Sequence, residues 1–214
     1  MSAAESPEPF TVAILAGGFG KRLGEDKASA LLLGRPLLHW MADAVAALSD
    51  ELLVARRADQ ELPPPPLGVV WREVTDLRGD AGPLAGIEAA LLASRHDIVL
   101  AVATDMPLVR PGLLRQIAAA CAGYDAVMPM LGKMAQPLCA GYRRSALPVI
   151  QDQLDAGDGR IRRIMETLRG RFLAEAELAA YDPDLESFTN VNRREDLARV
   201  EQVLAERKAA RREE

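Results

Sequence analysis

Short apolar runs alternate with segments of helical spacing along this chain, and the alternation restricts the folds that it can adopt. TVAILA (11–16) is a compact apolar run that ends at glycine, which is typical of a buried parallel strand. DIVLAVAT (97–104) is almost wholly apolar and is expected at the centre of the sheet. The pattern predicts a doubly wound, mostly parallel α/β sheet flanked by helices. Further strands are expected at 51–55, 69–71 (VVW), 125–130 and 137–142, and helices at 37–48, from Pro83, at 111–121 and at 193–210, with helical spacing also over 144–155 and 160–168.

The chain is expected to form a single domain. Its 214 residues are enough to bury a real core. Residues 1–10 are polar and contain proline, so we expect a disordered tail there, followed by one domain over residues 11–200. Residues 201–214 are predicted to be the charged end of a C-terminal helix, and LPPPPLG (62–68) a surface connection.

Composition excludes several classes of protein. A formal net charge of −5 argues against a nucleic-acid-binding surface as the main purpose. No apolar run reaches the ~18 residues that span a bilayer, and the start MSAAESPEPF lacks the features of a signal peptide. The two cysteines, Cys121 and Cys139, have no CxxC pattern and lie in apolar company, which favours small buried thiols. A reduced, cytoplasmic protein without membrane contact is expected.

The loop after the first strand, ILAGGFGKRLGEDK (14–27), is rich in glycine and cations. It fails as a dinucleotide fingerprint because Leu23 stands where the third glycine belongs, and it fails as a Walker A loop because no Gly-Lys-Ser/Thr closes it. Backbone N–H groups at Gly17 and Gly18, with Arg22 and Lys27 on the same loop, suit a polyphosphate. The alternative is a surface loop with solvated charges, which the position at a strand end disfavours.

Two acids follow other predicted strands, where ligands of doubly wound sheets collect. Asp105 ends the central apolar run, and a buried carboxylate needs a partner such as Mg²⁺. The alternative role, capping the next helix, is weaker because Pro107 and Pro111 place that helix further on. Asp76 precedes GDAGPLAGI (79–87), and either it or Asp80 could face a ligand or only form a turn.

The pattern LAGG-x-x-x-R-L-G-x-DK (15–27) resembles the signature of nucleotidyltransferases, and within them the molybdenum cofactor guanylyltransferases. GPLAGI (82–87), Gln136-Pro137 and SFTNVNRREDL (187–197) match further features of the family, so the resemblance runs from Thr11 to about Leu197. It implies one nucleotidyltransferase domain with a Rossmann-like fold. It also implies a nucleotide site at Leu15, Ala16, Gly17, Gly18, Lys27, Asp76 and Asp105, catalytic roles for Arg22, Lys27 and Asp105, and Mg²⁺ bound by Asp105.

The resemblance further implies an acceptor site at Gln136, Asn190 and Asn192. The two asparagines alternate along an extended backbone, so both side chains are expected on one face. One amide oxygen could complete a metal shell there, and the other could hold the acceptor. Helix capping is the alternative for Asn192, which lies just before the last predicted helix with Glu195 at capping-box spacing.

The implied reaction is transfer of GMP from GTP to the terminal phosphate of molybdenum-molybdopterin, with release of pyrophosphate. Some members carry an asparagine where this chain has Ala55, so the choice between guanine and cytosine stays open. Two different functions also fit the motifs: a nucleotidyltransferase with a sugar-phosphate acceptor, and a non-catalytic protein that binds nucleotide or molybdopterin. The charged surface also permits transient contacts with molybdenum insertion or molybdoenzyme maturation proteins.

Overall fold

A mostly parallel sheet forms the centre of the molecule. The computed structural model describes residues 8–20, 25–76 and 78–213. Within these residues the main sheet has the strand order β10-β9-β11-β8-β1-β6-β7, with β12 paired to β9. The pairs β1–β6, β1–β8, β6–β7 and β12–β9 are parallel, whereas β11 runs antiparallel to β8 and β9. The strands are β1 (Phe10–Leu15), β6 (Leu52–Arg57), β7 (Arg72–Asp76), β8 (Ile98–Ala103), β9 (Ala126–Leu131), β10 (Met134–Ala135), β11 (Cys139–Arg143) and β12 (Gly170–Leu173).

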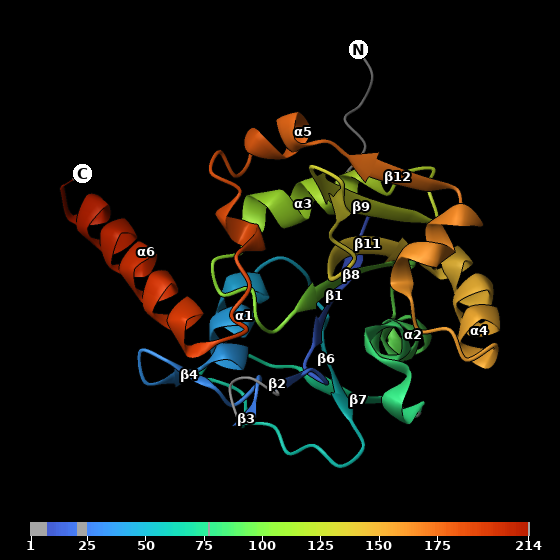
Figure 1. Cartoon of the computed structure of the whole chain (residues 1–214), viewed down its shortest axis with the longest axis horizontal. Helices are drawn as coiled ribbons and strands as arrows, with labels where there is room; N and C mark the ends of the chain where they lie inside the picture. The colour runs from blue at the N-terminus through green and yellow to red at the C-terminus, as the bar shows by residue number, and fades with distance from the viewer. Residues whose placement is uncertain (1–7, 21–24, 77, 214) are drawn as a thin grey trace.

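Helices cover both faces of this sheet (Figure 1), which confirms the predicted doubly wound architecture. On one face lie α1 (Leu37–Val45) and α3 (Pro111–Ala120), and on the other lie α2 (Pro83–Ala93) and α4 (Leu147–Asp155). Because successive side chains of a strand point to opposite faces, β1 contributes to both cores. Val12 and Ile14 join the α1–α3 core, and Ala13 and Leu15 join the α2–α4 core. DIVLAVAT forms β8, which lies between β1 and β11 and is wholly buried, as expected.

A smaller apolar cluster connects the C-terminal helix to the rest of the chain. Helix α6 (Arg194–Glu213) extends away from the sheet, while its first turns lie beside the hairpin of β4 (Leu31–Leu32) and β5 (Arg35–Pro36) (Figure 1). Val200 packs there with Leu32 and Leu37. The remaining short elements are β2 (Phe19–Gly20), β3 (Glu25–Asp26), α5 (Glu175–Ala179) and the 3₁₀ turns Gly79–Ala81, Arg144–Ala146, Ile161–Glu166 and Glu186–Phe188.

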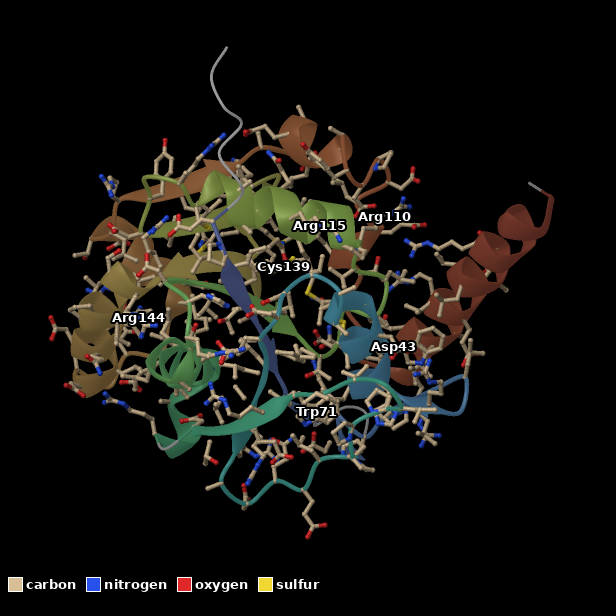
Figure 2. All side chains as sticks on the ribbon, turned by 180° about the vertical axis from the view of Figure 1, so that it is seen from behind. Asp43, Trp71, Arg110, Arg115, Cys139 and Arg144 are labelled. Atoms are coloured by element: carbon tan, nitrogen blue, oxygen red, sulfur yellow. The ribbon has the colours of Figure 1, made fainter. Side chains whose placement is uncertain are left out.

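The prediction of a strand at VVW (69–71) is wrong. The strand lies one step further on, at β7, and Val70 is 87% exposed. Val69 and Trp71 instead pack from an irregular segment against the core that contains the buried residues of α1. Figure 2 shows Trp71 near this helix. β7 is an edge strand of the described sheet, and its polar residues Arg72 and Glu73 are exposed.

Two predicted helical segments are shorter or tighter than their spacing suggested. Residues 144–155 form a 3₁₀ turn followed by α4, whose first turn contains Pro148, and 160–168 contain only the 3₁₀ helix Ile161–Glu166.

Residues 1–7 of the predicted tail lie outside the described residues. Glu8, which is described, pairs with Arg143 at 2.7 Å.

Both cysteines are free and buried, and Cys139 lies in the interior near α1 and α3 (Figure 2). Burial raises the pKa of each thiol to about 12. Both therefore remain protonated near neutral pH and serve as small apolar side chains. None of the helices in the described part of the chain is long and apolar enough to cross a membrane.

Candidate nucleotide-binding site

A cavity of about 370 Å³ opens beyond the C-terminal ends of four parallel strands. This is the edge where a doubly wound sheet binds its ligands. Glycines contribute much of its wall, so the backbone is accessible to a ligand. The lining residues are Leu15, Gly17, Gly18, Lys27, Ala55, Arg56, Arg57, Asp76, Gly79, Gly82, Pro83, Gly86, Thr104, Asp105 and Leu138.

Hydrogen bonds from neighbouring strands fix the chain where it leaves β1. The Thr104 hydroxyl donates to the Leu15 carbonyl at 2.7 Å, and the Ala16 N–H donates to the Ala55 carbonyl at 2.7 Å. Thr104 is 2% exposed and Ala16 is fully buried, so both bonds are shielded from water. The start of the glycine loop is therefore held by β6 on one side and β8 on the other.

Three side chains outside the predicted site hold the next part of the loop. The Gln60 amide donates to the Ala16 carbonyl at 2.9 Å and to Asp26 Oδ1 at 2.8 Å. Arg57 donates from Nη1 to the Gly17 carbonyl at 2.7 Å and from Nη2 to Asp26 Oδ2 at 3.0 Å. Asp26, Arg57 and Gln60 were not predicted from the sequence. The available signal was an Arg-x-x-Gln at the end of the second strand, on the same edge of the sheet as the glycine loop.

Lys27, Asp105 and Asn192 meet at this edge of the sheet. The Lys27 ammonium donates to Asp105 Oδ2 at 2.5 Å and to Asn192 Oδ1 at 2.6 Å. The Val191 N–H donates to the Asp105 backbone carbonyl at 2.8 Å, which joins the C-terminal segment to the end of β8. The side chains of Lys27 and Asp105 are only 18% and 12% exposed, so water screens their ion pair weakly.

These contacts contradict the two capping roles. The Asp105 carboxylate pairs with Lys27, and α3 begins only at Pro111 after an Arg110 that makes no side-chain cap. At the start of α6 the cap comes from Asp196 Oδ2, which accepts from the N–H groups of Asn192 and Arg193 at 2.9 Å each. The Asn192 side chain is thus left for Lys27.

The oxygen donors at this point fit a hard divalent cation. Asp105 has one carboxylate oxygen on Lys27, and its other oxygen, Oδ1, makes no hydrogen bond with the described residues. One carboxylate and one amide oxygen match Mg²⁺, which keeps several waters and substrate phosphates in its shell. Among the described residues no three His, Cys, Asp or Glu side chains gather as a complete metal cage. Such a cation would therefore depend on the nucleotide for further ligands.

Asp76 lines the cavity at the end of β7. Its Oδ1 accepts from the Arg78 N–H at 2.8 Å, which closes a tight turn. Burial, together with repulsion from Glu88, raises the pKa of the Asp76 carboxyl above its usual value. The competing Asp80 has a side chain outside the described part of the structure, so the structure tests only Asp76 of the two.

The other predicted site residues lie in different settings. Arg22 falls outside the described residues. Asn190 is exposed, unlike Asn192, and the structure joins only Asn192 to the Lys27–Asp105 pair. Gln136 donates from its backbone to the Pro129 carbonyl at 2.9 Å and lies two residues before the cavity residue Leu138. Neither Gln136 nor Asn190 is among the residues that line the cavity.

The fold and the site are those expected of a nucleotide-binding α/β protein, with a glycine loop, a cation and an acid at one sheet edge. Residues 12–173 match the MobA-like NTP transferase domain. The chain belongs to this family of nucleotidyltransferases, which confirms the resemblance noted in the sequence.

Relatives and solved structures agree with this placement. A molybdenum cofactor guanylyltransferase of Desulfosudis oleivorans is 34% identical over 201 residues, which cover 92% of this chain and 96% of the relative. Another, from Syntrophotalea carbinolica, is 30% identical and covers 86% of each chain. The crystal structure of molybdopterin-guanine dinucleotide biosynthesis protein A from Archaeoglobus fulgidus superposes with a TM-score of 0.78 at 28% identity, over 92% of this chain and 99% of that one.

A cytidylyltransferase shares the fold at lower identity. The 2-C-methyl-D-erythritol 4-phosphate cytidylyltransferase of Thermus thermophilus has a TM-score of 0.67 at 20% identity, over 90% of this chain and 98% of that one. This similarity supports the architecture alone. The choice of base depends on the residues that line the site, which the shared fold does not specify.

Proposed function

We propose that the protein transfers GMP from GTP to the terminal phosphate of molybdenum-molybdopterin and releases pyrophosphate. The observation that carries the proposal is the convergence of Lys27, Asp105 and Asn192 beside a glycine-walled cavity. Relatives that align over nearly their whole length bear the name of this activity. A catalytic role is favoured over simple binding because these polar groups gather at the ligand-binding edge of the sheet.

The proposed reaction is a direct displacement. An oxygen of the acceptor phosphate forms a bond to the α-phosphorus of GTP, and the bond from that phosphorus to the bridging oxygen of the β-phosphate breaks. The electron pair leaves with pyrophosphate. The attacking oxygen is already anionic, so no protein nucleophile is needed, and the protein contributes positioning and charge stabilisation.

Each described residue has a role that follows from its position. The backbone of Gly17 and Gly18 lines the cavity and would approach the phosphates, while Lys27 would neutralise charge on the β- and γ-phosphates. Asp105 and Asn192 would hold Mg²⁺, which supplies charge neutralisation at the phosphates when it is bound. We assign Arg22 to the leaving group, and Gln136 and Asn190 to the acceptor, from family resemblance.

The base would enter between Asp76 and the apolar wall formed by Leu15, Ala55 and Gly86. A β-carbon on Gly86 would stand 3.4 Å from Leu15 Cδ2 and 3.7 Å from Ala55 Cβ, so the wall is closely packed. Since Ala55 has no hydrogen-bonding side chain, it cannot read the edge of a base. We propose that the half-buried acid Asp76 contacts the base or ribose.

Thermal unfolding with Mg²⁺ and either GTP or CTP tests this proposal. A ligand at about 100 times its Kd stabilises the folded state by roughly 2.7 kcal/mol. GTP is expected to raise the Tm more than CTP at equal concentration. A larger shift with CTP would assign the site to a cytidylyltransferase. Equal shifts with no pyrophosphate release in the presence of acceptor would indicate a non-catalytic binding protein.

The free cysteines bear on the cellular compartment in which the reaction would take place. Two free, buried thiols are compatible with a reducing compartment, and we propose the cytoplasm.

A further inference from the structure

The peptide groups at the start of the glycine loop have one side fixed by side chains. In a trans peptide the carbonyl and the N–H point in opposite directions. The Ala16 carbonyl shares its peptide with the Gly17 N–H, and the Gly17 carbonyl shares its peptide with the Gly18 N–H. Gln60 binds the first carbonyl at 2.9 Å and Arg57 binds the second at 2.7 Å. These two bonds therefore set the direction of both N–H groups.

Both N–H groups are left available for a ligand. Neither the Gly17 nor the Gly18 N–H makes a hydrogen bond with the described residues, and both glycines line the cavity. Two adjacent donors on glycine form an anion-binding concavity when their directions are fixed beforehand. A donor with a fixed direction does not need to be reordered when the ligand binds.

One acid connects the two described parts of the loop. Asp26 Oδ1 accepts from Gln60 at 2.8 Å and also from the Ala28 N–H at 3.1 Å, while Oδ2 accepts from Arg57 at 3.0 Å. Asp26 directly precedes Lys27, so the same contacts that hold Ala16 and Gly17 also hold the backbone beside Lys27. Gln60 is 5% exposed, and its Oε1 accepts from the Arg57 N–H at 3.1 Å.

We infer that Gln60 and Asp26 are positioning residues for the triphosphate, and that with Arg57 they form a brace that aims the Gly17 and Gly18 N–H groups and Lys27 at one ligand. The inference rests on the proposed function only in taking a nucleoside triphosphate as the ligand. The brace orients groups that would contact the phosphates, so its effect does not depend on which base the nucleotide carries. Its contribution is expected in nucleotide binding, with the chemical step less affected.

The test compares Gln60→Leu with the wild-type protein, using GTP and guanosine as separate probes. Leucine approximates the volume of glutamine but donates nothing to Ala16 or Asp26. The Kd of Mg·GTP and the KM for GTP are expected to rise at least about tenfold, which corresponds to roughly 1.4 kcal/mol, while kcat changes by less than about threefold. The Kd of guanosine, which has no phosphates, is expected to stay unchanged.

A second variant and a control separate positioning from folding. Asp26→Asn keeps the shape of the side chain but weakens its contacts with Arg57, so a smaller rise in the Kd of GTP is expected. Thr11→Val also removes a buried donor, from Thr11 to Glu51 at 2.6 Å, but at the opposite end of β1. It is expected to lower the Tm and to leave the Kd of GTP unchanged.

Two outcomes would overturn the inference. One is an unchanged Kd of GTP in folded Gln60→Leu, and the other is an equal loss of affinity for GTP and guanosine, which indicates a merely structural role. If the wild-type protein binds CTP better than GTP, the proposed function fails. The brace is then tested with CTP and cytidine, and a loss confined to CTP would still support it.

Discussion

At the scale of single residues, the Lys27 ammonium group joins two parts of the site, the acid that follows β8 and the segment before α6. Its ammonium contacts Asp105 at 2.5 Å and Asn192 at 2.6 Å, and the same residue lines the cavity. A carboxylate that is 12% exposed needs such a partner. We expect a polyanionic ligand to compete with Asp105 for this ammonium group, and under the proposed function a divalent cation would take the place of Lys27 on the carboxylate.

Lys27→Ala is expected to lower kcat/KM for GTP by roughly 10- to 100-fold, because a charge-assisted contact with phosphate is lost. Steady-state kinetics at saturating acceptor measures the effect. Arg35→Ala removes another cation, one that pairs with Asp43 on the surface at 2.7 Å, and serves as the control with unchanged kinetics. An unchanged kcat/KM for GTP in Lys27→Ala would contradict the assigned role.

Asp105→Asn is expected to lower turnover by roughly 10²- to 10⁴-fold while the protein stays folded, because the amide keeps the shape but loses the charge for Mg²⁺. Pyrophosphate release measures turnover, and thermal unfolding checks the fold. The matched control is Asp97→Asn, just before the other end of β8, where Asp97 pairs with Arg143 at 2.6 Å. Retention of most of the GMP transfer by Asp105→Asn would rule out the metal role.

The sequence indicated the residues that lie at a strand end, and missed those that reach the site through long-range contacts. Asp105 follows a buried apolar run and Lys27 closes a glycine loop, so position alone indicated them. Gln60 lies 34 residues from Asp26 and 44 from Ala16, so the Arg-x-x-Gln after the second strand places it at the right edge of the sheet without indicating that its amide binds both. Such contacts become visible only once the strands are paired.

At the scale of secondary-structure elements, Glu51 joins several of them at the start of β6. It accepts from the Thr11 hydroxyl in β1 at 2.6 Å, from Arg72 in β7 at 2.8 Å, and from the Arg95 N–H after α2 at 2.7 Å. Burial by itself would raise the pKa of Glu51, but these hydrogen bonds outweigh it and lower the pKa to about 2. The carboxylate therefore holds together the edge of the sheet opposite the cavity.

The lowered pKa of Glu51 predicts acid sensitivity. A carboxyl with a folded-state pKa below its unfolded value stabilises the protein above the unfolded pKa and loses that contribution as pH falls toward the folded pKa. Here the interval runs from the usual 4.5 down to about 2, on the order of 3 kcal/mol in all. In denaturant unfolding, the stability advantage of the wild-type protein over Glu51→Gln is expected to shrink as pH falls through this interval. A constant difference would contradict the prediction.

Elements with strong apolar patterns were predicted well, and those that depend on tertiary context were not. β1 and β8 are buried on both faces, so their composition is nearly uniform. β7 is an edge strand of mixed residues, REVTD, and the apolar VVW before it suggested a strand in the wrong place. β12 and the 3₁₀ helix Ile161–Glu166 are short, so too few residues carry their periodicity.

At the scale of the whole molecule, the site is assembled from distant parts of the chain. The parallel strands β1, β6, β7 and β8 bring their C-terminal ends to one edge, where the cavity lies. The segment before α6 then returns to that edge, since Val191 binds the Asp105 carbonyl and Asn192 binds Lys27 across 165 residues. The last third of the chain therefore contributes Asn192 to the Lys27–Asp105 pair at this edge of the sheet.

The most direct test mixes the purified protein with Mg²⁺, GTP and molybdenum-molybdopterin, and follows pyrophosphate together with the nucleotide product. We expect one pyrophosphate released per guanine dinucleotide formed, dependence on the acceptor, and a lower rate with CTP. Pyrophosphate release no higher than in the acceptor-free control, or preferential formation of the cytosine dinucleotide, would contradict the proposed GMP transfer.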